Sequence, residues 1–268
     1  MFDSLTQIHG MFLRYVFLHR RSLMIRAFDI FFWPVMDLLI WGFVTLYVQR
    51  IAETQVAQLM LFLIGAMILW DIHYRGQQAV TISLMEEIWN RNLTNILISP
   101  LRLWEWLAAT CCYGALKVGL VTLILALVAK WLYAFDLIRV GWAFLPLAAN
   151  LLIFGWGIGL VTSGLLLRFG YAAEALIWGV PFLVQPFSCV FYPIDVLPTW
   201  AQMIARWLPS TYVFEGLRTV LRGGELSWTT WAQILGLNAL ALALGAGFFI
   251  WMFHRARSAG RLGRLSSS

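Results

Sequence analysis

The chain has 268 residues, of which 61% are hydrophobic and 12% are charged, and its formal net charge is +6. So few charges cannot cover the surface of a water-soluble domain of this length, so the composition excludes that class and predicts a membrane protein. The positive balance is typical of contact with anionic lipid headgroups, and we expect no nucleic-acid partner.

The first predicted element is an amphipathic helix over residues 1–27. Its apolar face comprises Leu5, Ile8, Phe12, Tyr15 and Val16, and its polar face comprises Asp3, Gln7, Arg14 and Arg21. This pattern is typical of a helix that lies in the membrane interface, with a flexible tail as the alternative. We expect no cleavable signal sequence, because the charges follow the amphipathic run and no small-residue cleavage site comes after it.

Residues 28–253 contain six apolar stretches that are candidates to cross the membrane. A hydrocarbon core of about 30 Å requires about 20 helical residues. Charged residues are absent from 140–167, 175–194 and 226–253; residues 30–49 contain only Asp37 and 106–129 only Lys117; residues 54–70 are uncharged and are expected to extend past Asp71. The predicted fold class is therefore an all-α polytopic membrane protein with six transmembrane helices.

An even number of crossings places both ends of the chain on one side of the membrane. That side then carries most of the cations: Arg14, Arg20, Arg21, Arg26, Arg75, Arg91, Arg102, Arg168, Arg255, Arg257, Arg261 and Arg264. The positive-inside rule predicts that this side is cytoplasmic, and that residues 254–268 form a basic cytoplasmic tail.

The sequence contains no recognisable ATPase motif. A phosphate-binding loop of the form GxxxxGK[ST] needs a lysine directly after a glycine, and neither Lys117 nor Lys130 follows a glycine. A drive by ATP would therefore require a second polypeptide. Transport driven by an ion gradient would need a carboxylate inside a membrane-spanning helix, and Asp37 is the candidate. A structural ion pair between Asp37 and Lys117 is the favoured interpretation. We expect no catalytic residue, metal or bound cofactor in this chain.

A short amphipathic segment follows the second predicted crossing, over about residues 84–98. Its apolar positions are Met85, Ile88, Trp89, Leu93, Ile96 and Leu97, and its polar positions are Glu86, Glu87, Asn90, Arg91 and Asn95. This spacing predicts one cytoplasmic helix that ends at Ser99-Pro100. It is either an interfacial support or a rigid element on which a partner docks.

A second unusual segment, over about residues 192–222, is apolar but interrupted by prolines. Pro193 and Pro209 bracket a predicted helix of about three to four turns, which is too short to cross the membrane. Its apolar face comprises Val196, Leu197, Trp200, Met203, Ile204, Trp207 and Leu208. The opposite face is polar, so the segment is suited to lie at an interface.

These two segments resemble the signatures of permeases of the ABC type-2 exporter family. The first signature runs from Glu86 through Asn92-Leu93-Thr94-Asn95 to Ile98-Ser99-Pro100. The second comprises Tyr192-Pro193, Leu197-Pro198, Trp200, Leu208-Pro209, Thr211-Tyr212 and the pair Glu215 and Arg218. With the interface helix and the six stretches, the resemblance covers nearly the whole chain.

The resemblance implies a permease subunit that works as a homodimer in a bacterial inner membrane. Separate cytoplasmic ATPase subunits would hold ATP and Mg and would contact Met85, Glu86, Glu87, Trp89, Asn90 and Arg91. Residues 192–222 would form a re-entrant hairpin before the last crossing, at the outer mouth of the translocation path. The gate residues would be Tyr192, Pro193, Leu197, Pro198, Trp200, Pro209, Glu215 and Arg218.

The cargo implied by the resemblance is a lipid, a glycan or a hydrophobic small molecule moved outward. Asp37, Trp41, Gly155 and Gly159 are candidates for the path or for a dimer face, because small residues allow helices to approach closely; internal packing is the alternative for the glycines. Trp41, Trp156 and Trp178 are candidates for a track that stacks sugar rings. Interfacial anchoring explains the tryptophans near the ends of the crossings.

Overall fold

The computed structural model describes residues 3–21, 23–51, 56–135 and 141–260. Its elements are α1 (Ser4–Arg21), α2 (Leu23–Ile51), α3 (Val56–Trp89), α4 (Leu93–Ile98), α5 (Leu103–Tyr133), α6 (Phe144–Phe169), η2 (Gly170–Ala173), α7 (Glu174–Val184), η3 (Gln185–Phe187), η4 (Ile194–Val196), α8 (Thr199–Ala205), α9 (Pro209–Leu221) and α10 (Trp228–Ser258). The predicted all-α class is confirmed for the described residues. The predicted basic tail is helical as far as Ser258, and residues 261–268 lie outside the described part.

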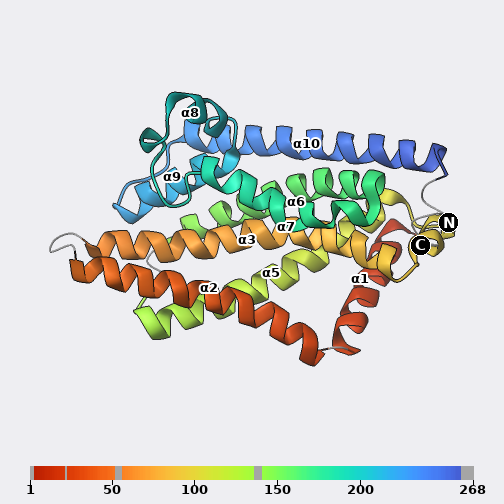
Figure 1. The fold of residues 1–268 in the computed structure, drawn as a ribbon, viewed down its shortest axis with the longest axis horizontal. Coiled ribbons are helices and arrows are strands. Elements are labelled where there is room, and N and C mark those ends of the chain that lie inside the picture. Colours follow the sequence, from red (N-terminus) through yellow and green to blue (C-terminus); the bar gives the residue numbers. More distant parts are fainter. Residues whose placement is uncertain (1–2, 22, 52–55, 136–140, 261–268) are drawn as a thin grey trace.

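The long helices α2, α3, α5, α6 and α10 run along the long axis of the molecule (Figure 1). Helices α1 and α4 lie at one end, here called the α4 end, and α8 and α9 lie at the opposite end, here called the α8 end. Three helical stretches are long and apolar enough to cross a membrane: Leu103–Tyr133, Gly141–Phe169 and Trp228–Ser258, with a shorter apolar stretch at Phe31–Tyr47. The chain is thus a multi-pass membrane protein, and the total of six crossings stays a prediction.

The stretch 175–194, predicted as the fifth crossing, is not one continuous helix. Helix α7 has 11 residues, which corresponds to a length of about 16 Å. The 3₁₀-helix η3 follows it, with Pro186 in its first positions. Pro186 has no N–H to continue the α-helical hydrogen bonds, and its ring clashes with the carbonyl group of Phe182. The prediction of a 20-residue helix at this place is therefore wrong.

Helix α6 packs between α3 and α10 through glycines. A Cβ atom on Gly155 would lie 2.5 Å from the carbonyl oxygen of His73 in α3, and one on Gly159 would lie 2.8 Å from that of Gln77. On the other side, Gly157 contacts Gly245 of α10 backbone to backbone. Gly155 and Gly159 therefore pack against α3 of the same chain. Internal packing, not a dimer face, describes these two positions.

Exposed tryptophans lie near both ends of the long helices. Trp131, Trp142 and Trp228 lie toward the α8 end, and Trp104 and Trp251 lie toward the α4 end. Along α5, the rise from Trp104 to Trp131 is about 40 Å, close to the thickness of a bilayer with its headgroup regions. Tryptophans prefer this interfacial depth, so their positions agree with helices that cross the membrane lengthwise.

Candidate functional site

The predicted cytoplasmic helix over residues 84–98 is two helices with a sharp turn between them. Helix α3 ends at Trp89 and α4 begins at Leu93. Between them, Arg91 adopts a positive φ of 54°, and the backbone N–H of Asn92 donates to the carbonyl oxygen of Glu87 at 2.9 Å. A left-handed residue directly after a helix closes its last turn and redirects the chain. The prediction of a single helix is wrong at this point.

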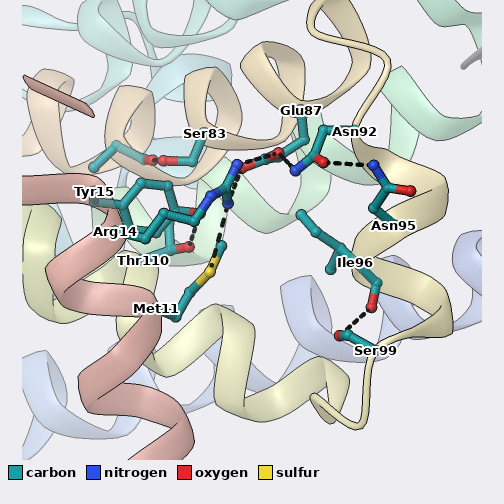
Figure 2. A network of polar contacts seen from close by, with 11 residues as sticks. Met11, Arg14, Tyr15, Ser83, Glu87, Asn92, Asn95, Ile96, Ser99 and Thr110 are labelled. Atoms are coloured by element: carbon teal, nitrogen blue, oxygen red, sulfur yellow. Dashed lines mark hydrogen bonds and ion pairs between the residues drawn. The ribbon is translucent and has the colours of Figure 1, made fainter. Parts of the chain in front are cut away.

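An ion pair fixes this turn to α1. Figure 2 shows Arg14 of α1 reaching Glu87 of α3, with Nη1 to Oε1 at 2.6 Å and Nη2 to Oε2 at 2.9 Å. Asn92 donates from Nδ2 to the same carboxylate at 2.7 Å, and Asn95 of α4 donates to Asn92 at 3.0 Å. The hydrogen bond with Glu87 raises the pKa of the Arg14 guanidinium above its ordinary value. One chain of contacts therefore joins α1, α3 and α4.

Helix α5 is joined to the same network. The hydroxyl groups of Tyr15 and Thr110 lie 3.3 Å apart, and the Tyr15 ring stacks on Tyr113 with a centroid distance of 5.5 Å. Beneath these polar contacts lies a buried apolar cluster that includes Met11, Tyr15, Leu84, Met85, Ile88, Leu93 and Trp106. Of the predicted apolar face of α1, Tyr15 packs inward and Leu5 is exposed, and the position of this helix in the membrane interface stays a prediction.

The burial at this turn sorts the predicted partner contacts into two groups. Met85 and Glu87 are buried, with exposures of 1% and 2%, so their side chains are not placed to touch a partner, and we correct that prediction. Trp89, Asn90 and Arg91 are exposed, and Glu86 is partly exposed. Ile98 of α4 is 78% exposed. Ile98 was not among the predicted partner contacts, because the predicted single helix did not include the turn between α3 and α4 that exposes it.

At the α8 end, the motif Glu215-x-x-Arg218 of α9 holds the preceding loop. Arg218 is 7% exposed and donates from Nη2 to the carbonyl oxygens of Cys189 at 2.6 Å and Tyr192 at 2.7 Å. It also pairs with Glu215 at 3.1 Å, and the Glu215 carboxylate accepts the backbone N–H of Ile194 at 3.0 Å. These contacts satisfy backbone groups that no regular helix or strand serves.

The prolines of this segment each precede or begin an element. Pro193 and Pro198 immediately precede η4 and α8, with Leu197 between these two elements, and Pro209 is the first residue of α9. Helix α8 has only seven residues, so the predicted helix of three to four turns is wrong. The Tyr192 hydroxyl donates to the carbonyl oxygen of Pro186 at 2.6 Å.

The two short helices of this segment differ in burial. Helix α9 packs Val213, Phe214 and Leu217 into the core. Helix α8 instead exposes its apolar side chains: Trp200, Met203 and Ile204, followed by Trp207, are between 44% and 70% exposed. The apolar face predicted for this segment therefore exists, and it points away from the rest of the chain.

A third feature is a cavity of about 590 Å³ that is lined mainly by α2, α3 and α7. We call it the aromatic cavity, because Trp33 and Trp41 of α2, Trp70 and Tyr74 of α3, and Trp178 and Phe182 of α7 line it. Asp37 also lines it, together with the ion pair of Asp71 and Arg75 in α3, the helix that was predicted to extend past Asp71.

The remaining predicted path residues lie elsewhere. Trp156, Gly155 and Gly159 do not line the aromatic cavity, whereas Lys117 lines a smaller pocket with Glu86. Within the described ranges, no group of three His, Cys, Asp or Glu side chains could hold a metal ion.

Comparison with known families gives a match that includes both signature segments. The family model described as ABC-2 type transporter matches residues 13–221. A comparison with curated proteins finds no match. The matched range covers well over half of the chain and includes the α3–α4 turn, the aromatic cavity and α9. The chain therefore belongs to the ABC-2 type transporter family and is a transmembrane, non-catalytic component of an ABC transporter.

Proposed function

We propose that the chain is the permease subunit of an ATP-driven exporter that moves a lipid, a glycan or a hydrophobic small molecule out across a bacterial inner membrane. Membership of the family implies a cytoplasmic ATP-binding subunit as its partner. ATP and Mg would be held by that subunit. Outward transport and a homodimer of permeases are supported by the resemblance of both signature segments.

The observation that carries this proposal is the exposed surface on a fixed turn at the α4 end. Trp89, Asn90, Arg91 and Ile98, here called the docking surface, are exposed, while Glu87 beneath them is held by Arg14. A nucleotide can shift a conformational equilibrium only through contacts that differ between its states. An ATPase that pulls on this surface would displace α1, α3 and α5 together, because the network joins them.

We assign residues 192–222, which include η4, α8 and α9, to an outer gate. It lies at the end of the molecule opposite the docking surface (Figure 1). Irregular backbone at membrane depth is tolerated only where its polar groups are satisfied inside the protein. Arg218 donates to two carbonyl groups of the loop that precedes η4, and Thr211 donates to a third, that of Phe187, at 3.1 Å. This supports a re-entrant hairpin. The distribution of cations supports placing both ends of the chain on the cytoplasmic side.

The proposal is tested by purifying the tagged protein from its native membrane in mild detergent and identifying the copurifying subunits. We expect an ATPase subunit in stoichiometric amount, and its loss from the double variant Arg91→Glu/Ile98→Asp. The control is Arg222→Glu, an exposed cation at the α8 end. Glu87 is unsuitable for this test, because its replacement would break the buried ion pair and not only the docking surface.

Recovery of this chain alone, even after gentle cross-linking, would contradict the proposal. So would an ATPase subunit that stays bound to the double variant as it does to Arg222→Glu. The first result would favour the alternative of an ion-coupled transporter or a channel.

A further inference from the structure

The aromatic cavity has the dimensions and walls of a small-molecule site. Its volume of about 590 Å³ falls within the range of about 300–1,000 Å³ that is usual for such sites. Trp41 is held in place by stacking on Phe191, with a centroid distance of 4.4 Å and an interplanar angle of 15°. A ring fixed in this way is pre-organised, so a ligand that contacts it loses less conformational entropy on binding.

The charges on the cavity wall do not cancel. Asp71 is compensated by Arg75, whose Nε lies 3.0 and 2.8 Å from the two carboxylate oxygens. Asp37 has no hydrogen bond or ion pair among the residues that the structure describes. The wall therefore carries one carboxylate in excess. Asp37 is exposed toward the open side of the cavity, and it lies within the apolar stretch Phe31–Tyr47. At membrane depth a carboxylate is costly unless a positive charge lies next to it, and a ligand is able to supply that charge.

Aromatic rings favour the same sign of ligand charge. The faces of Trp and Tyr rings are negative, and they attract a cation within about 6 Å of the ring centroid. Trp and Tyr side chains from both α2 and α3 line the cavity, as does Asp37. An uncharged sugar ring would stack on these tryptophans equally well, but it would bring no positive charge to a wall on which two carboxylates, Asp37 and Asp71, share Arg75. The combination of rings and one excess carboxylate thus selects a cation over a neutral glycan.

We propose that the aromatic cavity binds a hydrophobic organic cation, such as a quaternary ammonium or phosphonium compound, with Asp37 as its counter-ion and Trp41 and Trp178 as its stacking surfaces. Gln78 on the same wall has a buried Nε2 without a hydrogen-bond partner in the described part of the chain, and it is available to a polar group of the ligand. That this ligand is cargo rests on the proposed export function; that it binds does not.

The test is equilibrium dialysis of the purified full chain in nonionic detergent against tetraphenylphosphonium, with empty micelles as the blank. Tetraphenylborate has the same shape and the opposite charge, so it separates charge recognition from hydrophobic partition. We expect the cation to bind with at least about tenfold higher affinity than the anion, and Asp37→Asn to lower the affinity for the cation by at least about tenfold. Asp195→Asn, which removes an exposed acid outside the cavity, should bind as the wild type does.

A second variant keeps the test decisive if Asp37→Asn does not fold. Trp178 is 46% exposed, so Trp178→Leu should leave the protein monodisperse while it weakens binding of the cation several-fold. Equal affinity of wild type and Asp37→Asn for the cation would overturn the proposal, as would equal affinity of the wild type for the cation and the anion. No ATPase takes part in this assay, so its failure is distinct from a failure to copurify an ATPase subunit.

Discussion

Removal of Arg14 tests whether the α4 end is held together by a single ion pair. Glu87 accepts three hydrogen bonds, two from Arg14 and one from Asn92. Arg14→Leu removes two of them and leaves a carboxylate whose side chain is only 3% exposed. Breaking a fully buried pair costs about 3–5 kcal/mol. The Arg14 side chain is 34% exposed, so water compensates in part, and we expect a loss of about 2–3 kcal/mol.

The free energy of unfolding would be measured by titrating the protein in mild detergent with sodium dodecyl sulfate. The control is Arg20→Leu, which removes an exposed cation from the same helix and should change that free energy by less than about 0.5 kcal/mol. The double variant Arg14→Leu/Glu87→Leu should recover part of the loss, because it leaves no buried charge without a partner. If Arg14→Leu is as stable as Arg20→Leu, the pair does not fix the turn.

Two further variants test the other contacts that define the fold. Arg218→Lys keeps the charge but loses the planar guanidinium that donates to two carbonyl groups of the loop. In a Cys111→Ala/Cys112→Ala background, we expect maleimide to label the buried Cys189 about tenfold faster in Arg218→Lys than in the protein with Arg218. An unchanged labelling rate would show that the guanidinium does not hold the loop. Gly155→Ala places a methyl group against the backbone of α3. In the dodecyl sulfate titration it should lower the free energy of unfolding by about 1–3 kcal/mol, whereas Gly119→Ala, whose methyl group meets open space, should not lower it. Equal stability of the two variants would refute the close contact between α6 and α3.

The helical class and the membrane setting follow from the sequence because they depend on local composition. Uncharged stretches of sufficient length became α6 and α10, and the tryptophans near their ends lie where interfacial anchoring predicts. Pro193 and Pro209 also marked real boundaries, since a proline limits the backbone at its own position, whereas the predicted helix ran past the boundary at Pro198. These features require no knowledge of what packs against what.

The errors concern positions that distant residues determine. Glu87 reads as a surface residue on a helical wheel, but its partner Arg14 is 73 positions away and buries it. Arg91 interrupts the predicted helix because its backbone is left-handed, and nothing about an arginine side chain predicts that conformation. Gly155 fits a contact between subunits as well as one within a subunit, and only the position of α3 distinguishes them. Asp37, Trp41 and Trp178 were predicted for the path, but the rest of the aromatic cavity was missed for the same reason, because its walls come from segments far apart in the sequence.

The glycine contacts of α6 restrict which parts of the protein are able to move relative to one another. Where backbone lies directly on backbone, a helix cannot slide along its neighbour without pushing a bulky side chain, such as Phe154 or Ile158, into the space of a hydrogen atom. We therefore expect α3, α6 and α10 to move as one rigid body. Shear is left to the side-chain contacts of α2 and α7, which line the aromatic cavity together with α3. The width of the cavity would therefore change when α2 and α7 tilt against α3.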